Sequence, residues 1–302
     1  MPMTEPAYQI GKVSDTGPAR ERNEDYADYL LPEDEQAMRD KGSLFLVADG
    51  MGGHKAGQVA SREAVDQVMG AYYADPERDV GDCLVRAIKT ANEAIYDLAQ
   101  ADPEMAGMGT TVVAAVARDG GRRVTIANVG DSRAYVLRRQ RLTQITIDHS
   151  WVEAQYQAGM LTREQTQKHP QRNLITRAVG IRPDVEVDVY RTKLRRGDAL
   201  ILCTDGVSGE LSDEQIVEIA TSYPPSSAAE ELVAEANALG GTDNATALVV
   251  RAEPPAGLFG LSHNSALSHW LEQNWVRAVS VVVLIIVLLL VALLISYYPL
   301  DH

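Results

Sequence analysis

Residues 44–54 read LFLVADGMGGH, and this stretch decides the fold. Its apolar run, Leu44–Ala48, has the length and composition of a strand that is buried on both faces. The run stops directly at Asp49, and a glycine follows. Two later apolar runs also stop at an Asp, VTIANVGDS at Asp131, which a serine follows, and LILCTDG at Asp205, which a glycine follows. Since glycine lets another group approach the backbone closely, this repeated pattern predicts a site at the end of a sheet.

The rest of the body mixes strands and helices. The turn at 119–121 (DGG) joins two strand-like runs as a hairpin would, and strand and helix do not alternate strictly. An antiparallel α+β architecture is therefore favoured over a doubly wound sheet. Short β-branched runs predict further strands at Thr111–Ala117, Val124–Asn128, Ala134–Leu137, Ala199–Thr204 and Ala245–Val250. Helical spacing of apolar residues predicts helices at Gly57–Met69, Asp82–Ala99, Asp213–Ala220 and Ala228–Leu239.

Composition narrows the class of protein. The chain has 302 residues with 28 basic and 42 acidic side chains, so its formal net charge is 28 − 42 = −14. Its length suits one large domain or two small ones, and 45% hydrophobic residues exclude disorder over most of it. The acidic balance argues against nucleic acid as a partner. Cys83 and Cys203 stand far apart, which predicts neither a disulfide scaffold nor a structural zinc site.

Acidic residues recur where chemistry is expected. Besides the three acids that end strands, Glu24-Asp25 closes an early segment and Asp243 lies in GGTDNAT before the last strand. A single Asp-Gly is most often a turn. Acids that end three buried strands in one body instead favour a carboxylate cluster, and carboxylate oxygens are ligands that Mg²⁺ and Mn²⁺ prefer.

Several motifs occur in an order that resembles one known family. That family is the metal-dependent protein phosphatases of type 2C (PPM/PP2C), and the Met-Gly-Gly between Asp-Gly and His is similar to its bacterial branch. The likeness covers residues 8 to about 251. The motifs are SDTGPARERNED (14–25), VADGMGGH (47–54), MGTT (108–111), NVGDSR (128–133), CTDG (203–206) and GTDN (241–244).

The resemblance implies a fold and a metal site. The fold would be two stacked antiparallel β-sheets flanked by α-helices, an α/β/β/α sandwich, over residues 8–251. Asp49 would bridge two metal ions, with the carbonyl of Gly50 on one of them. Asp205 and Asp243 would complete the first site, and Asp25 would serve the second, directly or through water.

The resemblance also assigns roles around the metals. Asp131, with Asp205, stands where bacterial members hold a weaker third ion; a contribution of Glu24 is left open. Arg20 matches the position that grips the substrate phosphate, and a planar guanidinium can give two hydrogen bonds at once. His54 is a candidate proton donor to the leaving group. Ordering of the glycine loop or of a metal-bound water is an equal alternative for His54.

The implied activity is hydrolysis of phosphoserine and phosphothreonine in proteins. Two or three Mn²⁺ or Mg²⁺ ions would be the cofactors, because a metal pair can activate a bridging water near neutral pH. One alternative is a pseudophosphatase that binds without turnover, although all the acids and Arg20 are present. Another is a phosphohydrolase acting on a non-protein phosphate ester. The sequence contains no Walker-type or Rossmann glycine motif, which weakens a nucleotide version.

A polar stretch, residues 147–180, corresponds to the flap beside the metal site in the family. Trp151, His169, Arg172 and Arg177 could meet a phosphopeptide there. The alternative for each of the four is an ordinary solvated or packing residue.

The C-terminal part has a different composition. Residues 278–296 (AVSVVVLIIVLLLVALLIS) carry no charge, and as a helix they would rise about 28 Å, close to the thickness of a bilayer core. We therefore expect a transmembrane anchor over 276–298 after a linker over 252–275. Arg277 before the span and Asp301 after it favour a cytoplasmic catalytic domain, as does a start without a signal-peptide pattern. A membrane-bound Ser/Thr kinase would be the natural counteracting partner.

Overall fold

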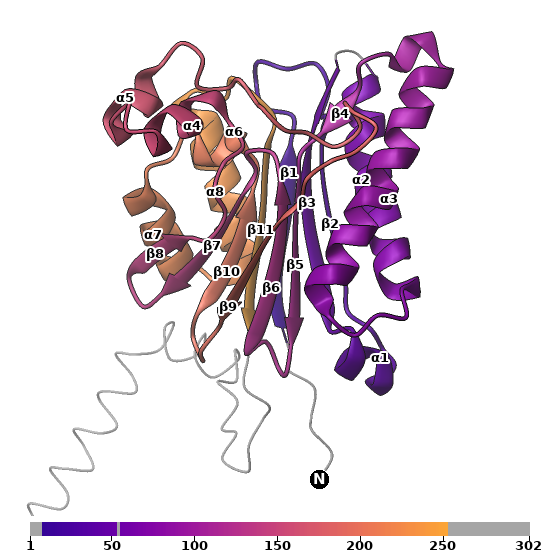
Figure 1. Cartoon of the computed structure of the whole chain (residues 1–302). Coiled ribbons are helices and arrows are strands. Elements are labelled where there is room, and N and C mark those ends of the chain that lie inside the picture. The colour runs from indigo at the N-terminus through magenta and orange to yellow at the C-terminus, as the bar shows by residue number, and fades with distance from the viewer. Residues whose placement is uncertain (1–7, 53–54, 253–302) are drawn as a thin grey trace, which may run out of the picture. The chain divides into compact units, whose positions relative to one another are not determined.

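Two β-sheets face each other between two layers of helices in the computed structural model, which describes residues 8–52 and 55–252 (Figure 1). These residues form one folded unit. Helices α2 (Ala56–Ala74) and α3 (Val80–Ala101) cover one sheet, and α7 (Asp213–Ser222) and α8 (Pro225–Leu239) cover the other. The α/β/β/α sandwich expected from the motifs is therefore confirmed.

The expected linker and transmembrane helix lie outside the described residues. Among the helices of residues 8–52 and 55–252, none is long and apolar enough to cross a bilayer.

Each sheet is antiparallel throughout its main path. The first has the strand order β1-β11-β10-β7-β8: β1 Tyr8–Asp15, β11 Ala245–Ala252, β10 Ala199–Cys203, β7 Arg133–Arg138 and β8 Arg141–Gln144. The second has the order β2-β3-β5-β6-β9: β2 Asp25–Leu30, β3 Ser43–Met51, β5 Val112–Arg118, β6 Arg123–Val129 and β9 Asp188–Lys193. A two-residue strand, β4 (Gly109–Thr110), pairs with the end of β3.

The central strands are apolar without alternation because both of their faces are buried. On β3, Leu44 and Leu46 pack under α2 and α3, whereas Phe45 and Val47 pack between the two sheets. The outer layers and the space between the sheets thus form three apolar clusters that extend through the unit. This arrangement explains why the run at 44–48 predicts a fully buried strand.

Within residues 8–252, the strands and helices predicted from the sequence are present, with ends that differ by a few residues. The structure adds elements that the sequence did not predict, among them the edge strands β1, β8 and β9. Edge strands have one solvated side and short apolar patterns, so their periodicity is weak. The shorter additional helices are α1 (Glu35–Asp40), α4 (Trp151–Gln157), α5 (Arg163–Lys168), α6 (Asp205–Ser208) and the 3₁₀ turn Pro103–Met105.

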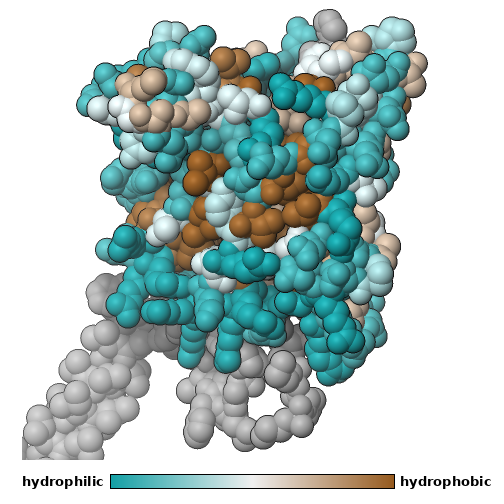
Figure 2. Space-filling model, viewed as in Figure 1, coloured by the Kyte–Doolittle hydropathy of each residue, from teal (hydrophilic) through white to brown (hydrophobic). Residues whose placement is uncertain are grey.

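Both sheets contribute to one end of the sandwich, at the top of Figure 1, where β4 and α6 lie. Hydrophobic residues are visible at the centre of the face in Figure 2, over the strands, whereas the upper end is mostly hydrophilic. The acidic residues singled out in the sequence lie at this end.

Candidate active site

Five aspartates from five separate segments lie at this end of the two sheets. Asp25 begins β2 and stands opposite Asp49 of β3 in the antiparallel register. Asp205 follows β10 directly and begins α6, and Asp243 precedes β11. Asp131 lies in the connection from β6 to β7, where the chain passes from one sheet to the other. The packing of the two sheets therefore brings these carboxylates together.

Burial and mutual repulsion disfavour the charged forms of four of these carboxylates and raise their pKa. Asp25 and Asp131 are each 6% exposed. Burial, aided by the charge of Asp205, raises the pKa of Asp25 to about 7, although hydrogen bonds from Thr246 and Thr204 lower it. Burial and Asp205 likewise raise the pKa of Asp131 to about 8. These groups would ionise readily only beside a positive charge.

Asp49 and Asp205 behave as a pair. Burial, together with the charge of Asp25, raises the pKa of Asp49 well above its usual range. Burial and the charge of Asp243 raise the pKa of Asp205, while a hydrogen bond with Asp49 opposes that rise. Each carboxylate of the cluster thus disfavours the charged form of its neighbours.

Several buried oxygen atoms of the site have no hydrogen-bond partner within the described part of the chain. Seven buried side-chain atoms of the described residues have no hydrogen-bond partner, and three of them are the Oδ1 atoms of Asp25, Asp131 and Asp205. Within those same residues, no three acidic, imidazole or thiol side chains already stand in a complete arrangement around one ion. Carbonyl and water oxygens would therefore have to complete the shell of each ion. The hard oxygen donors fit Mg²⁺ or Mn²⁺.

Gly50 sits where β3 passes very close to its neighbours. Its N–H donates to the carbonyl of Glu24 at 3.1 Å. A Cβ on Gly50 would lie 2.0 Å from the carbonyl oxygen of Gly57 and 2.6 Å from that of Glu24. Only glycine fits this approach, which fixes the β3 main chain beside Asp49.

Gly50→Ala is therefore expected to destabilise the fold by about 3 kcal/mol or more, because three backbone segments would have to separate. Urea unfolding measures the change. Gly70→Ala, on an exposed part of α2 with open space around it, is the matched control and should stabilise by up to about 1 kcal/mol. Equal effects of the two variants would contradict the close approach.

Arg20 lies beside the carboxylates, as expected for a phosphate-gripping residue. Its Nη2 donates to Asp243 Oδ2 at 2.7 Å and its Nε to the carbonyl of Thr242 at 3.3 Å. The side chain is 49% exposed, so its guanidinium can also be reached from solvent. The other predicted catalytic residue, His54, lies outside the described residues.

Asn244 is a residue that sequence reasoning did not single out. Its Oδ1 accepts the N–H of Glu24, and its Nδ2 donates to the carbonyls of Thr16 and Arg22, all at 2.8 Å. These bonds fasten the segment that carries Arg20 to the start of β11. The only sequence signal was its place next to Asp243, since its partners lie more than 200 residues away.

We expect Asn244→Ala to destabilise the fold by about 2–4 kcal/mol, because three main-chain groups lose a partner at once. Chemical unfolding measures this loss. Asn173→Ala, an exposed side chain at the pocket wall, should change stability by less than about 0.5 kcal/mol. A small effect at Asn244 would show that these bonds do not hold the segment.

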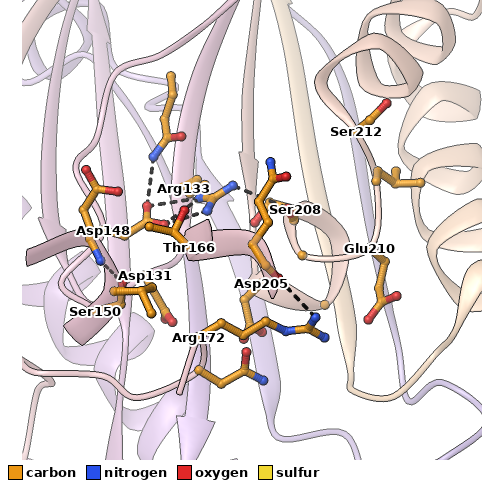
Figure 3. A pocket seen from close by; sticks show the side chains of 18 of the residues that line it. Asp131, Arg133, Asp148, Ser150, Thr166, Arg172, Asp205, Ser208, Glu210 and Ser212 are labelled. Atoms are coloured by element: carbon orange, nitrogen blue, oxygen red, sulfur yellow. Dashed lines mark hydrogen bonds and ion pairs between the residues drawn. The ribbon is translucent and has the colours of Figure 1, made fainter. Parts of the chain in front are cut away.

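A pocket of about 750 Å³ opens beside the carboxylates (Figure 3). Asp131, Asp205 and Asp243 line its inner side. Its outer walls are formed by residues of α4, α5 and the segment after them on one side, and by residues 206–214 on the other. The pocket is thus placed to receive the groups that flank a phosphate held at the carboxylates.

The four flap candidates have different surroundings. Arg172 lines the pocket. Trp151 packs against His169, with ring centroids 5.0 Å apart. Arg177 makes ion pairs with Glu186 and Asp188. Among these four, only Arg172 is in the pocket lining.

Comparisons with known proteins agree with this fold. The family model for protein phosphatase 2C matches residues 22–240. The serine/threonine phosphatase Stp of Listeria innocua is 36% identical over 242 residues, covering 78% of this chain and 93% of that protein. The family model and this relative show that the chain belongs to the protein phosphatase 2C family, of bacterial type.

Solved structures show the same relationship. The crystal structure of the serine/threonine phosphatase PstP/Ppp of Mycobacterium tuberculosis is 35% identical, with a TM-score of 0.72, and covers 82% of this chain and 99% of that one. The catalytic domain of PstP in complex with two manganese ions is 33% identical, with a TM-score of 0.69, over 81% of this chain and 97% of that one.

Proposed function

We propose that this chain hydrolyses phosphoserine and phosphothreonine in proteins with Mn²⁺ or Mg²⁺ as cofactor. Its relatives are named serine/threonine phosphatases, and one was solved with two manganese ions. The observation that carries the proposal is the gathering of five aspartates from five segments, three of which keep a buried oxygen without a partner. Burying such a cluster is costly unless a cation binds it.

The aspartates divide into two metal-binding groups in this proposal. Asp49 would serve both ions of the principal pair, and Asp131 with Asp205 would hold a third, weaker ion. A pair of divalent ions supplies acidified water and positive charge beside a phosphoryl group. The full set of residues proposed for the pair is Asp25, Asp49, the carbonyl of Gly50, Asp205 and Asp243.

Arg20 orients the phosphate. Its guanidinium is tied to Asp243 and is half exposed, so it stands between the carboxylates and the solvent. Two of its N–H groups can bind two phosphate oxygens in one plane, which fixes the phosphorus relative to the carboxylates. His54 stays a candidate for protonating the departing oxygen, or for ordering the loop around it.

The pocket suits a peptide better than a lipid. Among the described residues that line it, only Val152 and Leu211 have apolar side chains. The polar lining includes Gln144, Gln167 and Asn173, which can donate to and accept from a peptide backbone. An acyl chain would find little apolar surface here, so we favour phosphoproteins over lipid phosphate esters.

Turnover, rather than binding alone, is favoured by the completeness of the site. A pseudophosphatase would be expected to lack at least one metal-binding or phosphate-binding side chain. Here Arg20 and all five aspartates are present and lie at the same end of the sandwich.

The experiment uses the full chain, stripped of metal with a chelator. Phosphate release from a phosphothreonine peptide is followed as Mn²⁺ or Mg²⁺ is restored, with a nucleoside monophosphate as the competing substrate. We expect metal-dependent release from the peptide that Asp205→Asn abolishes and that Asp213→Asn, an exposed acid of the pocket wall, leaves in place. A folded protein that binds metal and releases nothing would make the pseudophosphatase the better reading.

We further propose that residues 276–298 anchor the chain in a membrane, with the catalytic domain in the cytoplasm and a membrane-bound Ser/Thr kinase sharing its substrates. The support is the uncharged run at 278–296. Membrane fractionation of cells expressing the full chain or residues 1–255 tests the anchor. Equal distribution of the two proteins would contradict it.

A further inference from the structure

Asp148 and His149 lie between β8 and α4, where the segment that walls the pocket begins. Both residues turn back to the β6–β7 connection that carries Asp131. From the sequence they were interpreted only as the start of the flap. Their contacts indicate a more specific structural role.

The dipeptide holds the chain on both sides of Asp131. His149 N–H donates to the carbonyl of Gly130 at 2.9 Å, and Gly130 N–H donates to His149 Nδ1 at 3.0 Å. Asp148 accepts from Arg133 Nε at 3.0 Å and from its Nη2 at 2.7 Å (Figure 3). The residue before Asp131 and the second residue after it are therefore both fastened to the root of the flap.

The imidazole of His149 is itself held in one orientation. Because the Gly130 N–H can only donate, Nδ1 is the acceptor and the proton of the neutral ring is on Nε2. Nε2 lies 3.4 Å from Asp188 Oδ2 of β9 and 3.0 Å from Arg177 Nη1. Asp188 also accepts from Arg177 Nη1 at 2.7 Å. Burial and the adjacent Arg177 lower the pKa of His149, although Asp188 opposes that shift, so the ring stays neutral at pH 7.

A second anchor links the same turn to Asp49. Ser132 Oγ and Thr111 Oγ1 lie 2.7 Å apart, and that threonine hydroxyl also accepts the N–H of Asp49 at 2.9 Å. Asp131 Oδ1 has no protein partner, so no side-chain bond holds that oxygen in place. The main chain on both sides of Asp131, which these bonds hold, therefore helps to position its carboxylate.

We propose that His149 is a positioning residue for Asp131: by accepting the N–H of Gly130, it holds the turn so that the Asp131 carboxylate faces the pocket and can bind the weaker ion. This inference rests on the proposed function, since it assumes that Asp131 binds a cation. It also means that the root of the flap and this ion site move together.

Two substitutions separate the acceptor role from simple packing. In His149→Asn, the amide oxygen can take the place of Nδ1 and still accept from Gly130, whereas in His149→Leu no acceptor remains. Mn²⁺ binding to the full chain is titrated by electron paramagnetic resonance. We expect His149→Leu to weaken the weakest binding step about tenfold, as loss of an outer-shell partner does, and His149→Asn to change it less than about threefold.

Controls assign the effect to Asp131. Asp131→Asn should remove the weakest binding step, and adding His149→Leu to it should cause no further loss. His169→Leu, a histidine of the flap that does not contact the turn, should bind Mn²⁺ like the wild type. Equal losses in His149→Asn and His149→Leu would overturn the acceptor role.

Amide hydrogen exchange of Gly130, followed by NMR in metal-free protein, tests the contact without any cation. Exchange should be slow in the wild type and His149→Asn and at least about tenfold faster in His149→Leu. Unchanged exchange in His149→Leu overturns the proposal at its first step. If that exchange rises but Asp131→Asn leaves Mn²⁺ binding unaltered, the assignment of the ion to Asp131 fails instead.

Discussion

Asp49→Asn is expected to reduce phosphate release by about 10³-fold or more while leaving the fold intact. Asp49 lies in β3, opposite Asp25 in register and in contact with the carboxyl of Asp205, so it stands at the centre of the cluster. An amide cannot supply the second anionic oxygen that a shared ligand needs. Losing one preorganised charge at a reacting centre already lowers turnover by about 10²–10³-fold, and this residue would serve two ions.

Steady-state turnover of a phosphothreonine peptide at saturating Mn²⁺ measures this loss. Asp66→Asn, an exposed acid on α2, is the matched control and should keep full activity. The metal-free Asp49→Asn protein should melt at least as high as the wild type, because the substitution removes a source of repulsion. Activity within tenfold of the wild type would contradict a central role for Asp49.

The metal-free protein is expected to lose stability as the pH rises from 5 to 8.5. The pKa of Asp25 is raised from 3.8 to about 7 and that of Asp131 to about 8, so the folded state holds protons that the unfolded chain releases. The free energy of unfolding therefore falls with pH between the unfolded and folded values and is constant outside them. At 1.36 kcal/mol for each unit, about 2 units from Asp25 and about 3 from Asp131 above pH 5 give a combined loss of about 7 kcal/mol.

Thermal denaturation in the presence of a chelator measures this dependence. A loss of that size lowers the melting temperature by on the order of 10 °C in a domain of this length. Mn²⁺ should stabilise the protein more at pH 8 than at pH 5.5, and Asp131→Asn should flatten the pH dependence. A metal-free protein that becomes more stable with rising pH would show that the aspartates are not buried together.

Local sequence patterns predicted those strands and helices whose burial requires a recognisable run of apolar residues. The run at 44–48 predicted a strand that is buried on both faces, and β3 is such a strand. The turn at 119–121 predicted the hairpin that joins β5 and β6. Helix ends were less well placed: α2 extends to Ala74 instead of Met69, and α8 begins at Pro225 instead of Ala228.

Contacts between distant segments were not visible in the sequence. Thr204 donates to Asp25 Oδ2 at 2.8 Å although 179 positions separate the two residues. Asn244 reaches Glu24 across 220 positions. The bond of His149 to Gly130 spans only 19 positions, yet it depends on how the flap root meets the β6–β7 connection. No periodicity encodes such pairs.

The order of the motifs in the sequence by itself indicated the family, and the layered fold was what that resemblance implied. Three of the acidic motifs, at Asp49, Asp131 and Asp205, also follow apolar runs that the sequence makes visible. Only the tertiary structure decided that Asp25 stands opposite Asp49, that Asp49 and Asp205 influence each other's pKa, and that Arg20 pairs with Asp243. The physical reason is that charge and hydrogen bonding act over a few ångströms in space. Residues of two different sheets come that close only when the sheets pack.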